Sequence, residues 1–202
     1  SFKGPIDKFI PEELKKELIS LAKLEKNDTI FFVADSEKRA TELAGQIRTE
    51  LGKRLGLIDE NVFQFAWIID FPMFELDDHD KLAFSHNPFS MPQGGLKALE
   101  EQNPLEILAY QYDIVCNGIE LSSGAVRNHD PEIMIKAFEL AGYSKEHIEE
   151  KFPALFNAFQ YGAPPHAGIA PGFDRMLMLL TESETIRDVI AFPMNSKAQD
   201  LM

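Results

Sequence analysis

The chain contains, late in its sequence, the stretch Gly168-Ile169-Ala170-Pro171-Gly172-Phe173-Asp174-Arg175. Apolar residues at helical spacing follow it, so its glycines stand directly before a predicted helix. Exposed amides at the start of a helix favour a phosphate, Asp174 suits the first helical turn, and the flat guanidinium of Arg175 can stack on a base. No Gly-Lys-Ser/Thr follows, so the stretch is not a Walker loop. A glycine-rich turn alone is common, and its meaning depends on the rest of the chain.

Two carboxylates, Asp113 and Glu120, lie upstream on an apolar segment predicted to be a strand. Between them, Asn117-Gly118 favours a turn or bulge that resets the alternation of the strand, so both carboxylates can point to one side. Hard divalent cations that hold phosphates take one or two carboxylates and otherwise water, so the pair suits Mg²⁺ with a nucleotide. On spacing alone, the simpler interpretation is that both residues lie on the solvated face of an antiparallel strand.

A third charged residue, Arg127, ends the same segment. It follows the run 122–125, whose small side chains let a ligand approach the backbone closely. A guanidinium there can form a two-pronged bond to a carboxylate. The simpler alternative is an arginine in a surface salt bridge.

A loop rich in Pro, Gly, Ser and Asn is predicted from Ser85 to Gly95, with His86 at its start. Loops of this kind close over substrates in some enzymes, and they are also ordinary surface loops. The sequence leaves both interpretations open. No spacing of His, Cys or carboxylate residues is typical of zinc, so we expect no structural metal.

The composition limits the classes of protein to which the chain can belong. Its 202 residues include 20 Lys and Arg against 33 Asp and Glu, and 45% are hydrophobic. This balance predicts a folded protein without a generic basic surface for nucleic acid. The single cysteine, Cys116, excludes an intramolecular disulfide and fits a reducing compartment, which favours a cytoplasmic location. The longest apolar run, residues 63–74, is too short to cross a membrane.

The first sixty residues predict a helix, a strand and a second helix. Apolar spacing after Pro11 indicates the first helix, residues 29–34 the strand, and Ser36 the N-cap of the second helix. These residues are few for an independent core, so we interpret them as the tail of a domain that begins upstream. We place the boundary near residues 59–62.

The remaining residues predict aromatic-rich strands followed by helices. The strongest strand signals cover residues 65–69 and 109–121. Asp130 with the following proline opens a helix that Gly142 ends, and Ser144 caps the next helix. The second part is therefore predicted to contain both strands and helices.

Taken together, these motifs resemble bacterial-type aspartyl-tRNA synthetases, a branch of the class II aminoacyl-tRNA synthetases. Gly168–Arg175 is similar to class II motif 3, and Trp67–Glu75 with His86–Phe89 is typical of the aspartate branch. Residues 1–60 look like the end of the GAD insertion domain, and residues 61–202 like the second half of the catalytic domain. The resemblance implies an α+β fold, with an antiparallel sheet of six or seven strands flanked by helices and preceded by part of a small α/β insertion domain.

The resemblance also implies roles for individual residues. The positions matching His86 and Arg127 bind aspartate, and Arg127 holds its side-chain carboxylate. The positions matching Asp113 and Glu120 lie at the Mg²⁺–ATP site. The ATP-binding set implied by the family comprises Glu120, Gly172, Phe173, Asp174 and Arg175, with the arginine against adenine.

The implied activity is that of an aspartate–tRNA ligase. Such an enzyme activates L-aspartate with ATP to aspartyl-adenylate and then transfers the aspartyl group to the 3′ end of tRNA-Asp. Charging of tRNA-Asn as well is left open, because the part that reads the anticodon lies outside the sequence. The implied partners are L-aspartate, tRNA and a second copy of the full-length enzyme in a homodimer, with no membrane.

Several parts of the family's sequence are expected before Ser1: motif 1, motif 2 and the anticodon-binding domain. The family also usually continues beyond Met202. We therefore expect this chain to be a fragment that is inactive alone. One alternative is a class II relative that makes aminoacyl-adenylates for a target other than tRNA, which the insertion-domain tail disfavours. Another is a non-catalytic interaction module, which the intact charged residues disfavour.

Overall fold

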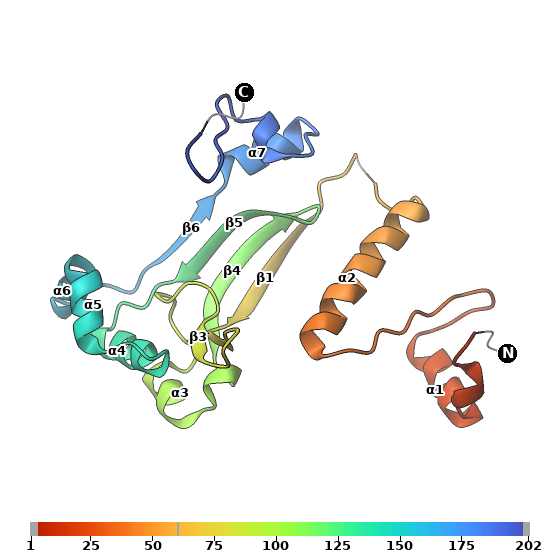
Figure 1. The fold of residues 1–202 in the computed structure, drawn as a ribbon, viewed down its shortest axis with the longest axis horizontal. Coiled ribbons are helices and arrows are strands. Elements are labelled where there is room, and N and C mark those ends of the chain that lie inside the picture. Colours follow the sequence, from red (N-terminus) through yellow and green to blue (C-terminus); the bar gives the residue numbers. More distant parts are fainter. Residues whose placement is uncertain (1–3, 60, 200–202) are drawn as a thin grey trace. The chain divides into compact units, whose positions relative to one another are not determined.

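The computed structural model describes residues 4–59 and 61–199 of the chain. The chain divides into two compact units, Ser1–Asn61 and Val62–Met202 (Figure 1). Across the described ranges, no helix is both long enough and apolar enough to span a membrane. The helices that were expected in the first unit are present, and the second unit contains the sheet.

The first unit consists of helices joined by extended segments. A 3-10 turn, η1, covers Asp7–Phe9, and the helices are α1 (Glu12–Leu21) and α2 (Glu37–Arg54). Ser36 occupies the N-cap position of α2, as predicted, although its side chain makes no capping hydrogen bond. Acidic residues in the first turn of each helix interact favourably with its dipole.

The predicted strand over residues 29–34 was wrong for this structure. These residues belong to no strand, and Phe31 and Phe32 are half exposed. An apolar run becomes a strand only when a neighbouring strand satisfies its amides and carbonyls. No described segment of the first unit provides that neighbour.

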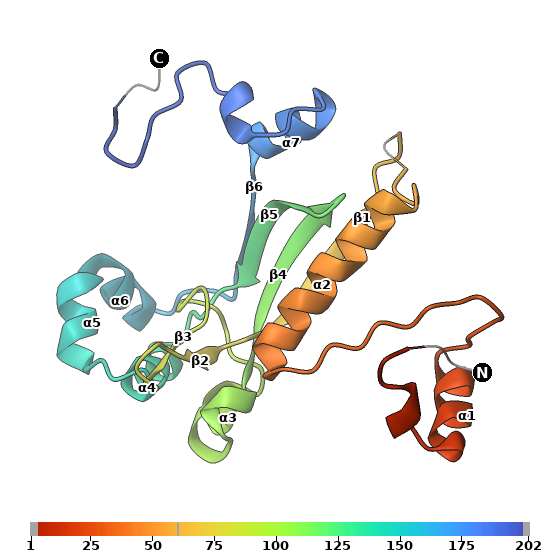
Figure 2. The ribbon, with the colours of Figure 1, turned by 45° about the vertical axis from the view of Figure 1, so that its right-hand side comes forward.

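The second unit is built on a four-stranded antiparallel sheet in the order β1-β4-β5-β6 (Figures 1 and 2). The strands are β1 (Phe65–Pro72), β4 (Leu108–Cys116), β5 (Ile119–Val126) and β6 (Ala167–Pro171). The described residues thus supply four of the six or seven strands that the family resemblance implies for a complete catalytic domain. Two short strands, β2 and β3, form a separate hairpin.

The turn between β4 and β5 is the one that the sequence predicted. Asn117 and Gly118 both have positive φ angles, 49° and 83°, as a tight hairpin turn requires. The register of the ladder then shifts between Ile114, opposite Ser122, and Val115, opposite Glu120. This bulge changes which side chains of β5 share a face with those of β4.

Strand β6 was missed by the sequence analysis, which interpreted residues 167–172 as a glycine-rich turn before a helix. Glycine and proline are poor strand formers, so composition gave no strand signal. The strand forms because β5 pairs with it and because Gly124 of β5 has no side chain. The Tyr112 ring lies over Gly124, and its hydroxyl donates to the main-chain oxygen of Gly168 at 3.1 Å.

The helices of the second unit lie at two ends of the sheet. Helices α3 to α6 gather at one end, and α7 lies at the other, where β6 ends (Figures 1 and 2). Asp130 caps α4 by accepting from the amides of Glu132 and Ile133, and Ser144 caps α5, as predicted. The remaining elements are β2 (Phe74–Leu76), β3 (Leu82–Phe84), α3 (Gly95–Glu101), η2 (Pro104–Glu106), α4 (Pro131–Leu140), α5 (Lys145–Lys151), α6 (Pro153–Gln160), α7 (Phe173–Leu180) and η3 (Ile186–Asp188).

The core of the second unit consists of two apolar clusters. The first joins Met73 and Phe74 to α3, the start of β4 and α4. The second joins α4, α5 and α6, with Met134 and Ile148 fully buried. Burial of a large apolar side chain contributes roughly 1.5–3 kcal/mol, so these clusters fix the helices at their end of the sheet.

Candidate functional site

A hollow of about 440 Å³ lies against strands β4 and β5 and contains three of the predicted site residues. They are His86, Asp113 and Glu120, which are far apart in the sequence. Other lining residues come from β1, β4, β5 and the loop after β3. These are Phe71, Asn87, Gln111 and Ser123.

The two carboxylates reach the same hollow because of the bulge. Asp113 of β4 stands opposite Ser123 of β5, and Val115 stands opposite Glu120. Residues 113 and 115 share one face of β4 by the alternation of a strand, so their partners on β5 lie on that side as well. Without the register shift, alternation along β5 would send Glu120 and Ser123 to opposite faces.

Glu120 also contacts the predicted nucleotide-binding segment. The Nη1 of Arg175 donates to the main-chain O of Glu120 at 2.7 Å and to its Oε1 at 3.0 Å. The side chains of this ion pair are 43% and 47% exposed, so both are reachable from solvent. The start of α7 is further fixed to β5 by the amide of Gly172, which donates to the carbonyl of Leu121 at 2.7 Å.

The other residues of the predicted ATP-binding set open α7. Phe173 is 68% exposed, and Asp174 lies in the first turn of the helix. Gly172 is close to the backbone of β5, where an added Cβ would lie 3.2 Å from the oxygen of Leu121. This segment does not line the hollow itself and is connected to it through the Glu120–Arg175 pair.

His86 is held by packing at the start of its loop. The ring of Phe71 meets the imidazole edge-on, with centroids 5.0 Å apart. Further along, the amide of Met91 donates to Val126 at 2.9 Å and that of Gln93 to Leu108 at 2.8 Å. The later part of the loop therefore pairs with the sheet, which leaves its first residues, 86–89, as the part nearest the hollow.

Arg127 follows β5 and does not line the hollow. It is half-buried, its amide donates to the carbonyl of His166 at 2.9 Å, and its backbone pairs with Ser90 of the loop. Within residues 4–59 and 61–199, no carboxylate forms an ion pair with its guanidinium. The structure thus gives no support to the alternative of a surface salt bridge.

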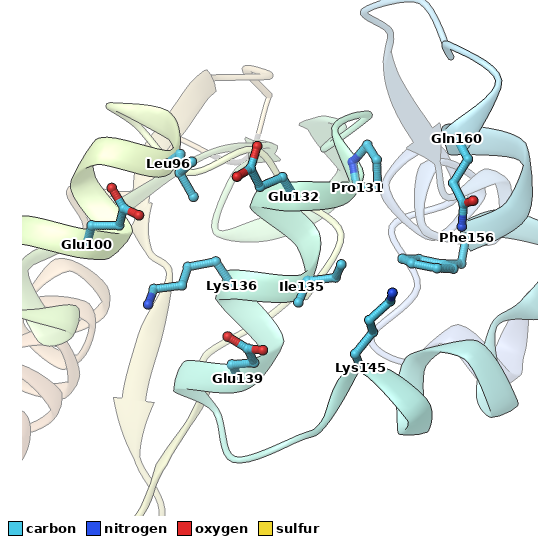
Figure 3. Close-up of a pocket in the computed structure, with 10 residues that line it drawn as sticks. All are labelled: Leu96, Glu100, Pro131, Glu132, Ile135, Lys136, Glu139, Lys145, Phe156 and Gln160. Atoms are coloured by element: carbon cyan, nitrogen blue, oxygen red, sulfur yellow. The ribbon is translucent and has the colours of Figure 1, made fainter.

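A second hollow, also of about 440 Å³, lies among the helices of the second unit. Figure 3 shows its lining from α3, α4, α5 and α6, with Glu132, Lys136, Glu139 and Lys145 around Ile135. Charges of both signs surround it, and none of the predicted site residues lines it. We therefore place the candidate site at the hollow on the sheet.

Residues 6–196 match the family described as tRNA synthetases class II (D, K and N). The chain belongs to this family. Over its whole length it is 59% identical to the aspartate–tRNA(Asp/Asn) ligase of Ehrlichia chaffeensis and 57% identical to the aspartate–tRNA ligase of Streptomyces avermitilis. It covers 34% and 35% of these two proteins, so the chain spans about a third of the length of the curated relatives it matches.

Solved structures of class II synthetases share the fold of this chain. An aspartyl-tRNA synthetase from Entamoeba histolytica matches with a TM-score of 0.51 at 23% identity, over 92% of this chain and 31% of that one. An asparaginyl-tRNA synthetase from the same organism matches with a TM-score of 0.50 at 19% identity, over 91% of this chain and 34% of that one. The predicted α+β class, an antiparallel sheet flanked by helices, is confirmed.

The hollow on the sheet is also lined by residues that were not proposed for the site from the sequence. Gln111 and Ser123 share the face of the sheet on which Asp113 lies, and Phe71 and Asn87 complete the hollow. Alternation from Asp113 along β4 was a usable signal for Gln111. Phe71 lies within the motif Trp67–Glu75, but alternation along β1 could not place its side chain, because the register shifts between Ile69 and Phe71.

Proposed function

We propose that this chain is part of an aspartate–tRNA ligase. The observation that carries the proposal is that His86, Asp113 and Glu120 line one hollow. The identity of 56–59% to aspartate–tRNA ligases along essentially the whole chain supports it. Residues 1–60 would then be the end of a GAD-like insertion domain, and residues 61–202 the motif 3 half of the catalytic domain.

Aspartate would bind near the loop and the end of β5. Arg127 would hold the side-chain carboxylate with two parallel hydrogen bonds, and His86 would add a donor from the loop. Arg127 is half-buried, and none of the ion pairs among the described residues includes its guanidinium. The backbone bridge between Ser90 and Arg127 joins the loop that starts with His86 to the end of β5.

ATP would bind along the start of α7, using Glu120, Gly172, Phe173, Asp174 and Arg175. Asp113 and Glu120 fit a Mg²⁺ ion by donor type and placement, because both carboxylates line the hollow and hard cations accept two carboxylates with water. No group of three or more His, Cys, Asp or Glu side chains placed to hold a metal occurs among residues 4–59 and 61–199. When bound, Mg²⁺ would supply positive charge against the phosphates.

The reaction would proceed in two steps without a covalent enzyme intermediate. The α-carboxylate of aspartate attacks the α-phosphorus of ATP, pyrophosphate leaves, and aspartyl-adenylate forms. A hydroxyl at the 3′ end of tRNA then attacks the aspartyl carbonyl, and AMP leaves. Positioning and charge neutralisation would supply the rate enhancement, which agrees with a site of arginines and carboxylates.

The partners of the full-length protein would be L-aspartate, tRNA-Asp and a second copy in a homodimer, in the cytoplasm. The relative from Ehrlichia chaffeensis is named as a ligase for tRNA(Asp/Asn), so the tRNA range is part of the test. The dimer and the anticodon contact would come from parts of the protein outside this chain.

The test uses the full-length protein that contains this chain. We expect aspartate-dependent exchange of pyrophosphate into ATP, followed by transfer of labelled aspartate to a tRNA-Asp transcript. Exchange without transfer to any tRNA would favour an adenylate-forming ligase with another target. Absence of exchange would favour a non-catalytic module and would refute the proposal.

Asp113 and the exposed Asp78 provide a matched pair of variants for this assay. Asp113→Asn should abolish most exchange, whereas Asp78→Asn, in the turn between β2 and β3, should leave it unchanged. Equal effects of the two substitutions would contradict the role given to Asp113.

A further inference from the structure

The first residues of the His86 loop are attached to the sheet by a side chain that has no role in the proposed reaction. Gln111 lies on β4, two residues before Asp113, and is only 7% exposed. Its Nε2 donates to the main-chain O of Asn87 at 3.3 Å. Leaving a buried amide without a partner costs roughly 1–3 kcal/mol of folding free energy. The hydrogen bond therefore holds the Gln111 side chain and the Asn87 carbonyl together.

The carbonyl that Gln111 contacts also closes a turn. The amide of Ser90 donates to the same oxygen of Asn87 at 3.2 Å, and the amide of Phe89 donates to the Asn87 Oδ1 at 2.9 Å. Both lone pairs of the Asn87 carbonyl are therefore used. Residues 87–90 form a closed turn that Gln111 fastens to β4.

Backbone hydrogen bonds fix the loop on either side of His86, at Ser85 and at Phe89. The short segment between them is attached to the sheet by Gln111. The amide of Ser85 donates to Met73 at 3.2 Å, and the carbonyl of Phe89 accepts from Asn128 at 2.8 Å. Between these anchors, in the described part of the chain, Gln111 provides the one side-chain hydrogen bond from the sheet. His86 lies inside this interval, held otherwise by the edge-on ring of Phe71.

We infer that Gln111 is a positioning residue that sets the place of His86 over the hollow. Gln111 lines the hollow, and we assign its effect to the hydrogen bond with the carbonyl of Asn87. The kinetic consequence rests on the proposed function, since it assumes that His86 contacts aspartate. The structural consequence, a loop fastened to β4, does not depend on that assumption.

The first test measures amide hydrogen exchange in the full-length protein. Gln111→Leu keeps a side chain of similar size without the donor, and Gln111→Glu keeps the shape with an ionised acceptor. Both should speed exchange at Phe89 and Ser90 while exchange in β4 and β5 stays unchanged. The matched control is Ser122→Ala, a buried polar residue on the opposite face of the sheet whose hydroxyl has no hydrogen-bond partner among the described residues.

The second test measures pyrophosphate exchange with the same variants. Loss of one hydrogen bond should raise the KM for aspartate about two- to tenfold, with the KM for ATP within about twofold of wild type. A merely structural role would instead lower the amount of active enzyme and leave both KM values alone.

The outcomes separate the inference from the proposed function. Unchanged amide hydrogen exchange at residues 86–90 in both Gln111 variants would overturn the inference, whatever the rate of pyrophosphate exchange. Faster amide hydrogen exchange in the loop with an unchanged KM for aspartate would overturn the link between the loop and substrate binding. A wild-type protein without aspartate activation would refute the proposed function, while the amide exchange would still decide the role of Gln111.

Discussion

The guanidinium of Arg175 bonds both the backbone and the side chain of Glu120, at 2.7 and 3.0 Å. These two residues are 55 positions apart and belong to α7 and β5. The pair joins the start of α7, which the sequence analysis likens to class II motif 3, to the hollow that contains Asp113. It therefore gives a direct structural link between the residues proposed to bind the nucleotide and those proposed to bind the metal.

Glu120→Gln should reduce activity far more than stability. A solvent-exposed ion pair contributes about 0–1 kcal/mol, and the main-chain bond from Arg175 survives the change. Loss of a transition-state contact of this kind costs on the order of 10²-fold in rate. Denaturant unfolding and pyrophosphate exchange of the full-length protein check both parts. Glu101→Gln, at another exposed ion pair on α3, is the control and should leave exchange unchanged.

Arg127→Leu should collapse kcat/KM for aspartate. A guanidinium pairs with both oxygens of a carboxylate, and a mismatched buried polar group can be worth roughly 10⁴-fold in specificity. The KM for ATP should stay within a few-fold of wild type, as measured by exchange at varied ATP. Arg54→Leu, at a surface ion pair of α2, is the control. Surviving aspartate activation, or a parallel loss of ATP binding, would show that Arg127 does not hold the side-chain carboxylate.

The 202-residue chain expressed alone should catalyse neither step. The family resemblance places the arginine that contacts the α-phosphate in motif 2, which is not among these residues, and one such contact is worth on the order of 10²- to 10³-fold. Pyrophosphate exchange and tRNA charging, each compared with the full-length protein at equal concentration, check this. Exchange at the full-length rate would require a complete site within this chain.

Gly124→Ala should destabilise the second unit by about 1–3 kcal/mol, because a methyl group would meet the Tyr112 ring and the Gly168 carbonyl. The Gly168 oxygen is backbone and cannot rotate away. Gly45→Ala in α2 is the matched control, since its methyl group would meet nothing within 4 Å and alanine favours a helix by about 1 kcal/mol. Thermal unfolding of the full-length protein measures both changes. An unchanged midpoint of thermal unfolding in Gly124→Ala would contradict the close packing of the Tyr112 ring on Gly124 of β5.

The local signals in the sequence determined the helices and the hairpin turn. Asp130 and Ser144 cap helices as predicted, because their short polar side chains accept amide hydrogens at a helix start wherever that helix packs. Asn117-Gly118 forms the turn for a similarly local reason, namely its tolerance of positive φ. The charged residues proposed for the site were also recognisable, since their spacing and the family motifs are properties of the sequence alone.

Tertiary structure decided the rest. Strand β6 has glycine, alanine and proline around a single isoleucine and forms because β5 lies beside it, whereas residues 29–34 have strong strand character and no described neighbour to pair with. The place of Glu120 depends on a one-residue register shift against β4, and the hydrogen bond of Gln111 depends on a loop more than twenty residues away. Hydrogen-bond partners and register are relations between distant segments, so propensity at one position cannot specify them.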